Sequence, residues 1–208
     1  PLAGGPLGPA PGNPIAVQPM PGHLMAAAKP HLRGILRTPH AAGTREGWEP
    51  LERNERTVDF PPAVMQDLQA LVTPYLFRAY PEPERLYGKL AAWLGVAREQ
   101  VLITQGADGA LRAIFDAFVA PGDEVVSAAP SYAMYPIYAA QAQACFQTVA
   151  FNADLTLRIE QLLERITPQT KLVVLASPNQ PIERVYDEEE RRALLSACRR
   201  QGALLVMD

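Results

Sequence analysis

Apolar residues recur every three or four positions in two early segments of the chain, residues 60–72 and 83–95. This spacing places the apolar side chains on one face of a helix, so both segments are predicted to be amphipathic helices. The first segment opens with proline, which is favoured at the first helical position. Gly95 follows the last apolar residue of the second segment, where glycine commonly ends a helix.

From residue 101 onward, short apolar runs alternate with helical patterns. The strands expected from these runs are 101–104, 124–128, 146–151, 172–176 and 203–207. The helices expected between them are 108–119, 132–143, 155–166 and 187–201. Because helical connections of this length join parallel strands, we predict an α/β fold with a mainly parallel sheet and helices on both faces. In such sheets, ligands bind beyond the carboxyl ends of the strands.

Composition divides the chain into three parts. Residues 1–30 contain 13 proline or glycine residues, and the first acidic residue is Glu46, so residues 1–44 are predicted to be a flexible leader. This leader lacks the basic start and continuous apolar core of a secretory signal. Residues 45–80 are predicted to be an N-terminal segment and arm, and residues 81–208 to hold the sheet.

Charge and residue content disfavour several classes of function. The 208 residues carry a formal charge of −3, which gives no reason to expect a nucleic acid or a charged membrane as partner. No apolar run approaches the roughly 20 residues needed to cross a bilayer. The two cysteines, Cys145 and Cys198, favour a reducing compartment, here the cytoplasm. All three histidines lie in the leader (His23, His31 and His40), which disfavours a histidine base or a histidine-bound metal.

Small, polar and aromatic residues follow the expected strands. They are Gly106, Ala107, Asp108 and Gly109 after the first strand, Pro130, Ser131 and Tyr132 after the second, Ser177, Pro178, Asn179 and Gln180 after the fourth, and Asp208 after the last. Because the carboxyl ends of parallel strands meet at one edge of a sheet, we expect these residues to line one crevice.

The residue types in this crevice suit a planar aromatic cation that carries a phosphate. Backbone N–H groups of residues 107–109, at the start of a helix, would hold the phosphate. Tyr132 would lie over the ring face. A carboxylate at the ring nitrogen would keep that nitrogen protonated, since an opposite charge favours the charged form. This description fits pyridoxal 5′-phosphate (PLP), whose chemistry needs a protonated ring nitrogen.

Each of these residues also has a purely structural interpretation. Asp108 can be an N-cap, because its side chain can accept hydrogen bonds from the first N–H groups of a helix. Tyr132 can be a core residue, Asn179 and Gln180 can belong to a turn, and Asp208 can be solvated. Their expected position at one edge of the sheet is what favours a common site.

Several ordered motifs between Asn54 and Asp208 strengthen this hypothesis. They are "RNERTVDFPP", "YPEPERLYGKLAAWLGV", "TQGADGALRAIFDAFVAPGDEVV" and "PSYAMY". Together they resemble the N-E-N-P segment, the Y-P-[DE]-P helix entry, the phosphate loop and the P-[ST]-Y-x-M-Y motif of fold-type I PLP-dependent aminotransferases. The resemblance is closest to the histidinol-phosphate aminotransferase branch.

The resemblance implies a role for each cofactor-binding position. Ala107, Asp108 and Gly109 would line the phosphate site through their backbone, while the Asp108 side chain caps the helix. Tyr132 would stack on the ring of PLP. Asp208 would pair with the ring nitrogen. Tyr80 matches a tyrosine that reaches the phosphate of the partner subunit, which implies a homodimer.

The same resemblance implies an amino donor and a 2-oxo acid as substrates, with histidinol phosphate as the best single candidate. It also implies a large PLP-binding domain that is incomplete over residues 81–208. Two positions depart from the family pattern in the segment that replaces N-P-x-G. Gln180 replaces the asparagine that bonds the ring hydroxyl, and Glu183 replaces a turn glycine. A third departure is Gly109, where the family commonly has glutamate.

The chemistry of this family also needs a lysine that forms a Schiff base with PLP. The chain has Lys29 in the leader, Lys89 within an expected helix and Lys171 at the amino end of an expected strand. None has the surroundings of the S-x-x-K motif in the family, so no catalytic residue is expected among these 208 and the lysine is expected beyond Asp208.

Two other hypotheses remain open at this point. The chain can be a naturally short, non-catalytic relative that binds PLP weakly or pairs with a longer homologue. It can also be a generic nucleotide-binding α/β domain, although residues 106–111 lack the G-x-G-x-x-G spacing of dinucleotide-binding turns.

Overall fold

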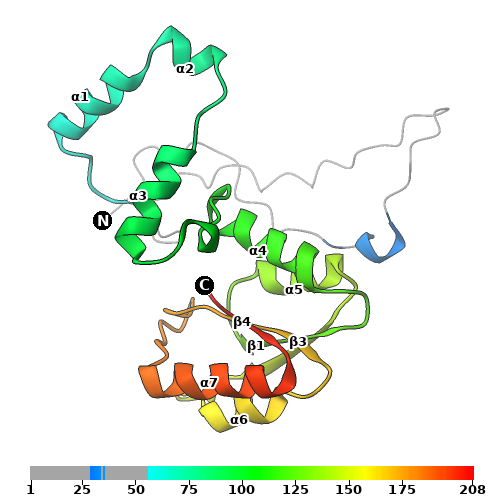
Figure 1. Ribbon diagram of the computed structural model, residues 1–208. Helices are drawn as coiled ribbons and strands as arrows, with labels where there is room; N and C mark the ends of the chain where they lie inside the picture. The colour runs from blue at the N-terminus through cyan, green and yellow to red at the C-terminus, as the bar shows by residue number, and fades with distance from the viewer. Residues whose placement is uncertain (1–28, 34, 36–55) are drawn as a thin grey trace, which may run out of the picture.

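The computed structural model of this protein describes residues 29–33, 35 and 56–208 (Figure 1). Most of the leader predicted over residues 1–44 therefore lies outside the described residues. The part of it that is described holds a short 3₁₀ helix, η1 (Pro30–Leu32). The division between residues 45–80 and 81–208 stays a prediction.

The described residues form one sheet of four parallel strands. These are β1 (Glu124–Ala129), β2 (Cys145–Ala150), β3 (Thr170–Leu175) and β4 (Leu204–Met207), in the order β2-β1-β3-β4. From β1 the chain continues to β2 on one side, and later to β3 and β4 on the other side. The strand order thus reverses between β1 and β3, which is where open α/β sheets bind their ligands.

Helices cover both faces of this sheet, as Figure 1 shows. One face packs against α4 (Gly106–Phe118) and α5 (Met134–Gln141), and the opposite face against α6 (Ile159–Arg165) and α7 (Glu188–Gln201). The connection through α5 runs in the opposite direction along the sheet from those through α6 and α7. Right-handed crossovers in opposite directions place their helices on opposite faces. The predicted α/β fold with a mainly parallel sheet is confirmed.

The inner strands are apolar because both of their faces are covered. On β3, Leu172 and Val174 pack in the core under α4 and α5, whereas Val173 and Leu175 pack in the core under α6 and α7. All four side chains are fully buried. The one buried hydroxyl of β1, on Ser127, donates a hydrogen bond of 2.8 Å to the carbonyl of Val174.

The strand predicted over residues 101–104 is wrong. This segment forms no strand, and none of the four strands that the structure describes pairs with it. Leu102 is 72% exposed, and the Ile103 N–H donates a hydrogen bond of 3.1 Å to the hydroxyl of Tyr87. Its β-branched pattern was correct for an extended backbone, but a strand also needs a neighbour.

Three helices precede the sheet region: α1 (Pro62–Leu71), α2 (Pro74–Arg78) and α3 (Glu84–Leu94). As predicted, α1 opens with proline, and α3 ends at Gly95, whose φ of +67° suits glycine. Among the residues that the structure describes, the apolar face of α1 contacts no core, and α1 and α2 contain no buried residue. After α3, a second 3₁₀ helix, η2 (Arg98–Gln100), returns to α3 through the Arg98–Glu84 ion pair at 2.7 Å.

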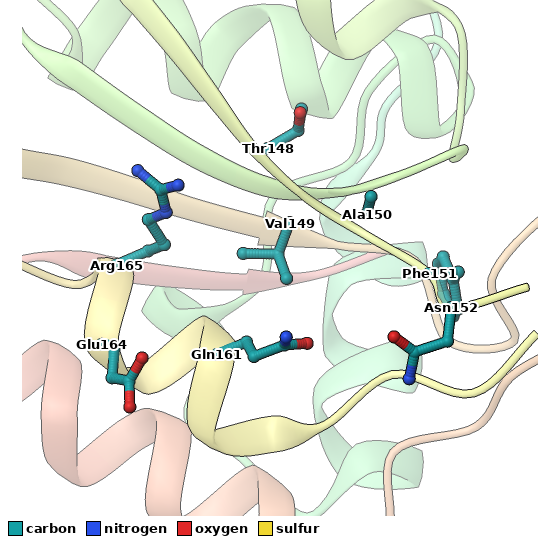
Figure 2. A pocket seen from close by; sticks show the side chains of 8 residues that line it. All are labelled: Thr148, Val149, Ala150, Phe151, Asn152, Gln161, Glu164 and Arg165. Atoms are coloured by element: carbon teal, nitrogen blue, oxygen red, sulfur yellow. The ribbon is translucent and has the colours of Figure 1, made fainter.

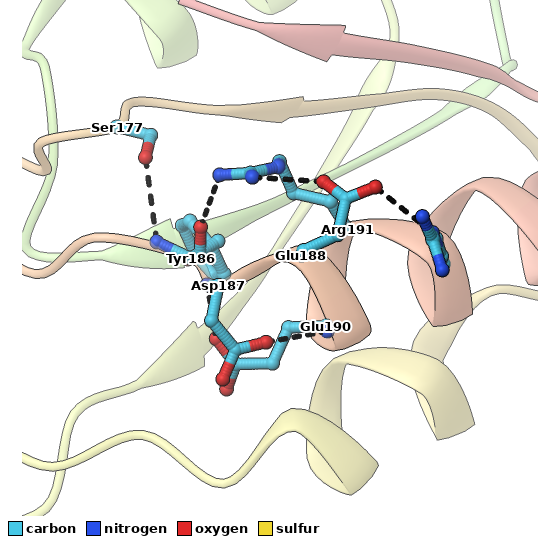
Figure 3. Close-up of polar contacts among 7 residues, drawn as sticks. Ser177, Tyr186, Asp187, Glu188, Glu190 and Arg191 are labelled. Atoms are coloured by element: carbon cyan, nitrogen blue, oxygen red, sulfur yellow. Dashed lines mark hydrogen bonds and ion pairs between the residues drawn. The ribbon is translucent and has the colours of Figure 1, made fainter.

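Hydrogen bonds hold the start of α7 in two places (Figure 3). One set lies within the first turn of the helix, and another bond runs from Tyr186, just before the helix, to Ser177, just after β3. Asp187 and Glu190 form a capping box, in which each side chain accepts from the backbone N–H of the other, at 2.8 and 3.1 Å. The Tyr186 N–H donates to the hydroxyl of Ser177 at 3.3 Å. The segment between β3 and α7 is therefore held at both ends.

Within that segment, residues 179–184 form a tight loop. The Asn179 N–H donates to the Arg184 carbonyl at 2.7 Å, and the Glu183 N–H donates to the Asn179 carbonyl at 2.5 Å. Glu183 has a φ of +58°, a left-handed conformation that glycine adopts more easily than any L residue with a side chain. The glutamate therefore replaces glycine at a position where the backbone is strained.

We predict that Glu183→Gly stabilises the protein by about 0.5–1 kcal/mol, because relief of left-handed strain exceeds the entropy that glycine adds to the unfolded chain. Urea unfolding followed by circular dichroism measures this change. The matched control, Glu183→Ala, removes the same carboxylate but keeps a Cβ at this φ, so it should give no such gain. Equal stabilisation by both variants would mean that charge, not strain, is the cause.

Candidate active site

A cavity of about 270 Å³ lies beyond the carboxyl ends of β3 and β4, beside the segment that follows β1. Its lining residues come from the start of α4, the segment before α5, the segment after β3 and the end of β4. They are Ala107, Asp108, Tyr132, Ala176, Pro178, Gln180 and Asp208. Five of the seven residues predicted from the sequence thus lie together here. The other two, Gly109 and Tyr80, do not line the cavity.

The wall formed by α4 presents the amino end of a helix of 13 residues. Its first residue, Gly106, has a φ of +73°, and its N-cap, Gln105, makes no side-chain hydrogen bond to the helix. The first N–H groups of an α-helix have no partner within the helix and carry a partial positive charge. The Gly106 N–H already donates to the Thr104 carbonyl at 2.9 Å, so this wall can hold an anion through the backbone N–H groups of Ala107 and Asp108.

Gly109 lies one position farther along α4 and faces Thr104. A Cβ on Gly109 would come within 3.3 Å of the Cβ of Thr104, which is closer than ordinary van der Waals contact. The glycine therefore allows residues 104 and 105 to approach the helix. This close approach is a structural reason for a residue without a side chain at this position.

The expectation that Asp108 caps α4 is wrong. The helix begins two residues earlier, at Gly106, because a glycine readily takes the positive φ of the turn. The Asp108 side chain instead accepts a hydrogen bond of 2.6 Å from the hydroxyl of Tyr132. A carboxylate in the first helical turn still interacts favourably with the helix dipole, and here it also orients the Tyr132 ring.

Asp208 is held in the wall by its backbone and its side chain. Its N–H donates to the carbonyl of Leu175 at 2.9 Å, and its carbonyl accepts from the N–H of Ser177 at 2.9 Å, so the β3–β4 ladder extends to this residue. The fully buried Tyr135 donates its hydroxyl to Oδ2 of Asp208 at 2.6 Å. This bond uses one of two carboxylate oxygens, and a carboxylate can accept several hydrogen bonds.

Burial, and then the Asp208 carboxylate, raise the pKa of Tyr135 far above its ordinary value. Tyr135 therefore stays protonated and remains a donor. Tyr135 is a site residue that the sequence patterns did not predict, although it lies in the motif "PSYAMY". The available signal was its position three residues after Tyr132, and the two rings meet edge to face with centroids 5.5 Å apart.

The remaining residues predicted for the site lie at different depths. Gln180 is exposed and lines the cavity. Asn179 is only 1% exposed and does not line it, and its Nδ2 donates to the carbonyl of Pro130 at 3.0 Å. Tyr80 is 95% exposed, in the segment between α2 and α3.

A larger cavity, of about 730 Å³, lies elsewhere, between the end of β2 and α6 (Figure 2). None of the residues predicted for the site lines it, and its charged residues, Glu164 and Arg165, are exposed. It borders an edge strand, away from the reversal of strand order between β1 and β3. The smaller cavity has the convergent polar groups, so we take it as the candidate active site.

Among the residues that the structure describes, no group of three or more histidine, cysteine, aspartate or glutamate side chains could hold a metal ion. In the same part of the chain, no helix is long and apolar enough to cross a membrane.

Comparison with known sequences connects this geometry to one family. The profile of aminotransferase class I and II matches residues 48–208. Histidinol-phosphate aminotransferase of Caldanaerobacter subterraneus subsp. tengcongensis is 33% identical over 159 residues, which cover 75% of this chain and 45% of the relative. The enzyme of the same name from Paramagnetospirillum magneticum is 34% identical over 160 residues, which cover 76% of this chain and 43% of the relative.

Solved structures agree with the sequence comparison. Histidinol-phosphate aminotransferase from Sinorhizobium meliloti, in complex with pyridoxal-5′-phosphate, superposes with a TM-score of 0.63 at 26% identity, over 71% of this chain and 40% of that one. Aspartate aminotransferase from Thermus thermophilus with maleate gives a TM-score of 0.67 at 28% identity, over 76% and 44%. This chain spans less than half the length of these relatives. On the family match over most of its length, the chain belongs to the aminotransferase class I and II family.

Proposed function

We propose that this chain carries the cofactor-binding part of a PLP-dependent aminotransferase that uses an amino acid or amino phosphate and a 2-oxo acid. The observation that carries the proposal is the single cavity in which the amino end of α4 and the Asp208 carboxylate converge. Histidinol phosphate is our candidate amino donor, on the strength of the curated relatives of that name. We place the activity in the cytoplasm, in line with the low cysteine content.

The residues of the cavity fit PLP in charge and shape. The amino end of α4 suits the phosphate, and Asp208 suits a protonated ring nitrogen. Among the described residues, no lysine or arginine lines the cavity, so the phosphate would depend on backbone N–H groups. The cavity volume of about 270 Å³ lies just below the roughly 300–1,000 Å³ typical of small-molecule sites, which suits a small ligand.

The lining residues would contact different parts of PLP. Backbone N–H groups of Ala107 and Asp108 hold the phosphate, and the Tyr132 ring covers one face of the site and excludes water from it. Asp208 keeps the ring nitrogen protonated, and Tyr135 holds the carboxylate in place through the 2.6 Å bond to Oδ2. Gln180 offers an amide to the ring hydroxyl. When bound, PLP supplies the electron sink that stabilises charge developing on the substrate.

None of the three lysines of this chain is placed to react at the cavity. Lys89 is exposed on α3, Lys171 lies at the amino end of β3, and Lys29 is exposed next to η1. This arrangement favours, as a second candidate, a non-catalytic relative that binds PLP without a covalent bond. Both candidates share the same cofactor site, so a binding experiment tests the part that they have in common.

We also propose that the protein forms a homodimer in which Tyr80 reaches the phosphate site of the partner subunit. The support in this chain is the exposed apolar surface of α1 and α2. Leu71 of α1 is 66% exposed and Phe77 of α2 is 79% exposed. Apolar surface of this extent is typical of an interface.

Asp208→Asn should weaken PLP binding by roughly 10- to 100-fold, because a charge-assisted hydrogen bond contributes about 1.5–3 kcal/mol. Isothermal titration of the chain with PLP measures the affinity. The control, Asp116→Asn, removes the same charge from an exposed position of α4 and should bind as the unchanged protein does. Equal loss in both variants would contradict a local role for Asp208.

Borohydride reduction of the PLP-saturated chain should leave no stoichiometric pyridoxyl adduct, because no lysine lies in the cavity wall. The intact mass should stay at 22.7 kDa. A single adduct on Lys89 or Lys171 would show that a lysine reaches bound cofactor and would contradict the placement of the site.

Leu71→Glu should convert the dimer to monomer, because a buried charge at an apolar interface is costly. Sedimentation equilibrium should change from twice the chain mass of 22.7 kDa to that mass. Leu195→Glu, at a half-exposed apolar position of α7, is the matched control and should leave the dimer intact. A monomeric unchanged protein would refute the homodimer proposal.

A further inference from the structure

Asn179 is a buried polar side chain that no step of the proposed function uses. It is 1% exposed and belongs to the segment that follows β3, where it contacts the segment that follows β1. Its Nδ2 donates to the carbonyl of Pro130 at 3.0 Å. This bond joins two segments that are 49 residues apart in the chain and that border the reversal of strand order.

The direction of this bond is set by chemistry. The Pro130 carbonyl can only accept, so the asparagine must present its amide N–H₂ group to it. The other half of the amide, Oδ1, is buried and finds no donor among the residues that the structure describes. A buried acceptor without a donor costs free energy, so Asn179 is a poor choice for core stability alone. What the amide provides is the link to Pro130.

The two linked segments each contribute lining residues to the candidate active site. Pro130 is two residues before Tyr132, and Asn179 directly precedes Gln180. The backbone of Asn179 also closes the 179–184 loop, through hydrogen bonds with Arg184 and Glu183. A shift of Asn179 would therefore move the whole loop that carries Gln180.

The far end of the same loop is anchored independently. Arg184 forms an ion pair of 2.5 Å with Glu190, and both side chains are about four-fifths buried. Glu190 is also the capping-box residue at the start of α7, which Figure 3 shows. The loop thus has one end fixed to α7. Beyond the pairing of β1 with β3, the bond from Asn179 to Pro130 ties its other end to the segment that carries Tyr132.

We propose that Asn179 is a positioning residue that sets the separation between the Tyr132 wall and the Gln180 wall of the cavity. Without its hydrogen bond, the two segments depend on the pairing of β1 with β3 and gain freedom relative to each other beyond the strand ends, so the walls match a planar ligand less well. The role of these walls in holding a cofactor rests on the proposed PLP site. The link between the two segments does not depend on that proposal.

Hydrogen exchange followed by mass spectrometry on the full chain tests the link without any ligand. In Asn179→Ala, peptides covering 130–135 and 177–187 should both exchange about tenfold faster, the effect of losing one buried hydrogen bond. Peptides from β3 and from the remainder of α7 should keep the rates of the unchanged protein. The matched control, Asn152→Ala, removes an amide hydrogen bond of 2.9 Å in the loop after β2 and should leave both peptides unaffected.

Asn179→Asp separates the donated bond from side-chain size. The carboxylate has the same shape but only accepts, so near neutral pH this variant should exchange as Asn179→Ala does. As the pH is lowered through the range in which the carboxyl group becomes neutral, its O–H can donate to Pro130 and protection should return. A loss of packing alone would give no such recovery.

Titration with PLP is the second measurement. Asn179→Ala should bind PLP about tenfold more weakly than Asn152→Ala, which should match the unchanged protein. Faster exchange in 177–187 alone, or a uniform increase over all peptides, would overturn the positioning role. If the unchanged protein binds no PLP, the proposed function fails, while the exchange pattern still decides whether Asn179 links the two segments.

Discussion

Parallel pairing of β1 with β3 is the contact on which the candidate site depends. Both strands lie in the middle of the sheet and are buried on both faces, so their carboxyl ends are fixed relative to each other. The chain leaves β1 toward one edge and β3 toward the other, and this divergence opens a space between the segments that follow them. The cavity lined by Tyr132, Gln180 and Asp208 lies at that position.

Charge gives this cavity its chemical character. One wall is the amino end of α4, with backbone N–H groups and a partial positive charge. The other wall holds Asp208, which Tyr135 contacts from the core with a hydroxyl that stays protonated. A ligand with an anionic group at one end and a cationic ring at the other complements both walls, which is why the site suits PLP better than a purely anionic nucleotide.

Sequence patterns predicted the sheet elements well because apolar periodicity reports which face of each element is buried. They failed where the outcome depends on a distant partner. Residues 101–104 have a strand pattern but no pairing neighbour, and the apolar face of α1 has no core to cover it among the described residues. Asp108 and Tyr135 illustrate the same limit for side chains. The partner of Asp108 lies 24 residues away in the sequence, and the partner of Tyr135 lies 73 residues away, so no local pattern could assign their hydrogen bonds.

A crystal structure of this chain with PLP would test the central claim most directly. The account predicts the phosphate at the N–H groups of Ala107 and Asp108, the ring against Tyr132, and the ring nitrogen within hydrogen-bond distance of the Asp208 carboxylate. PLP bound in the cavity between β2 and α6, or in the predicted cavity with its ring nitrogen turned away from Asp208, would contradict it.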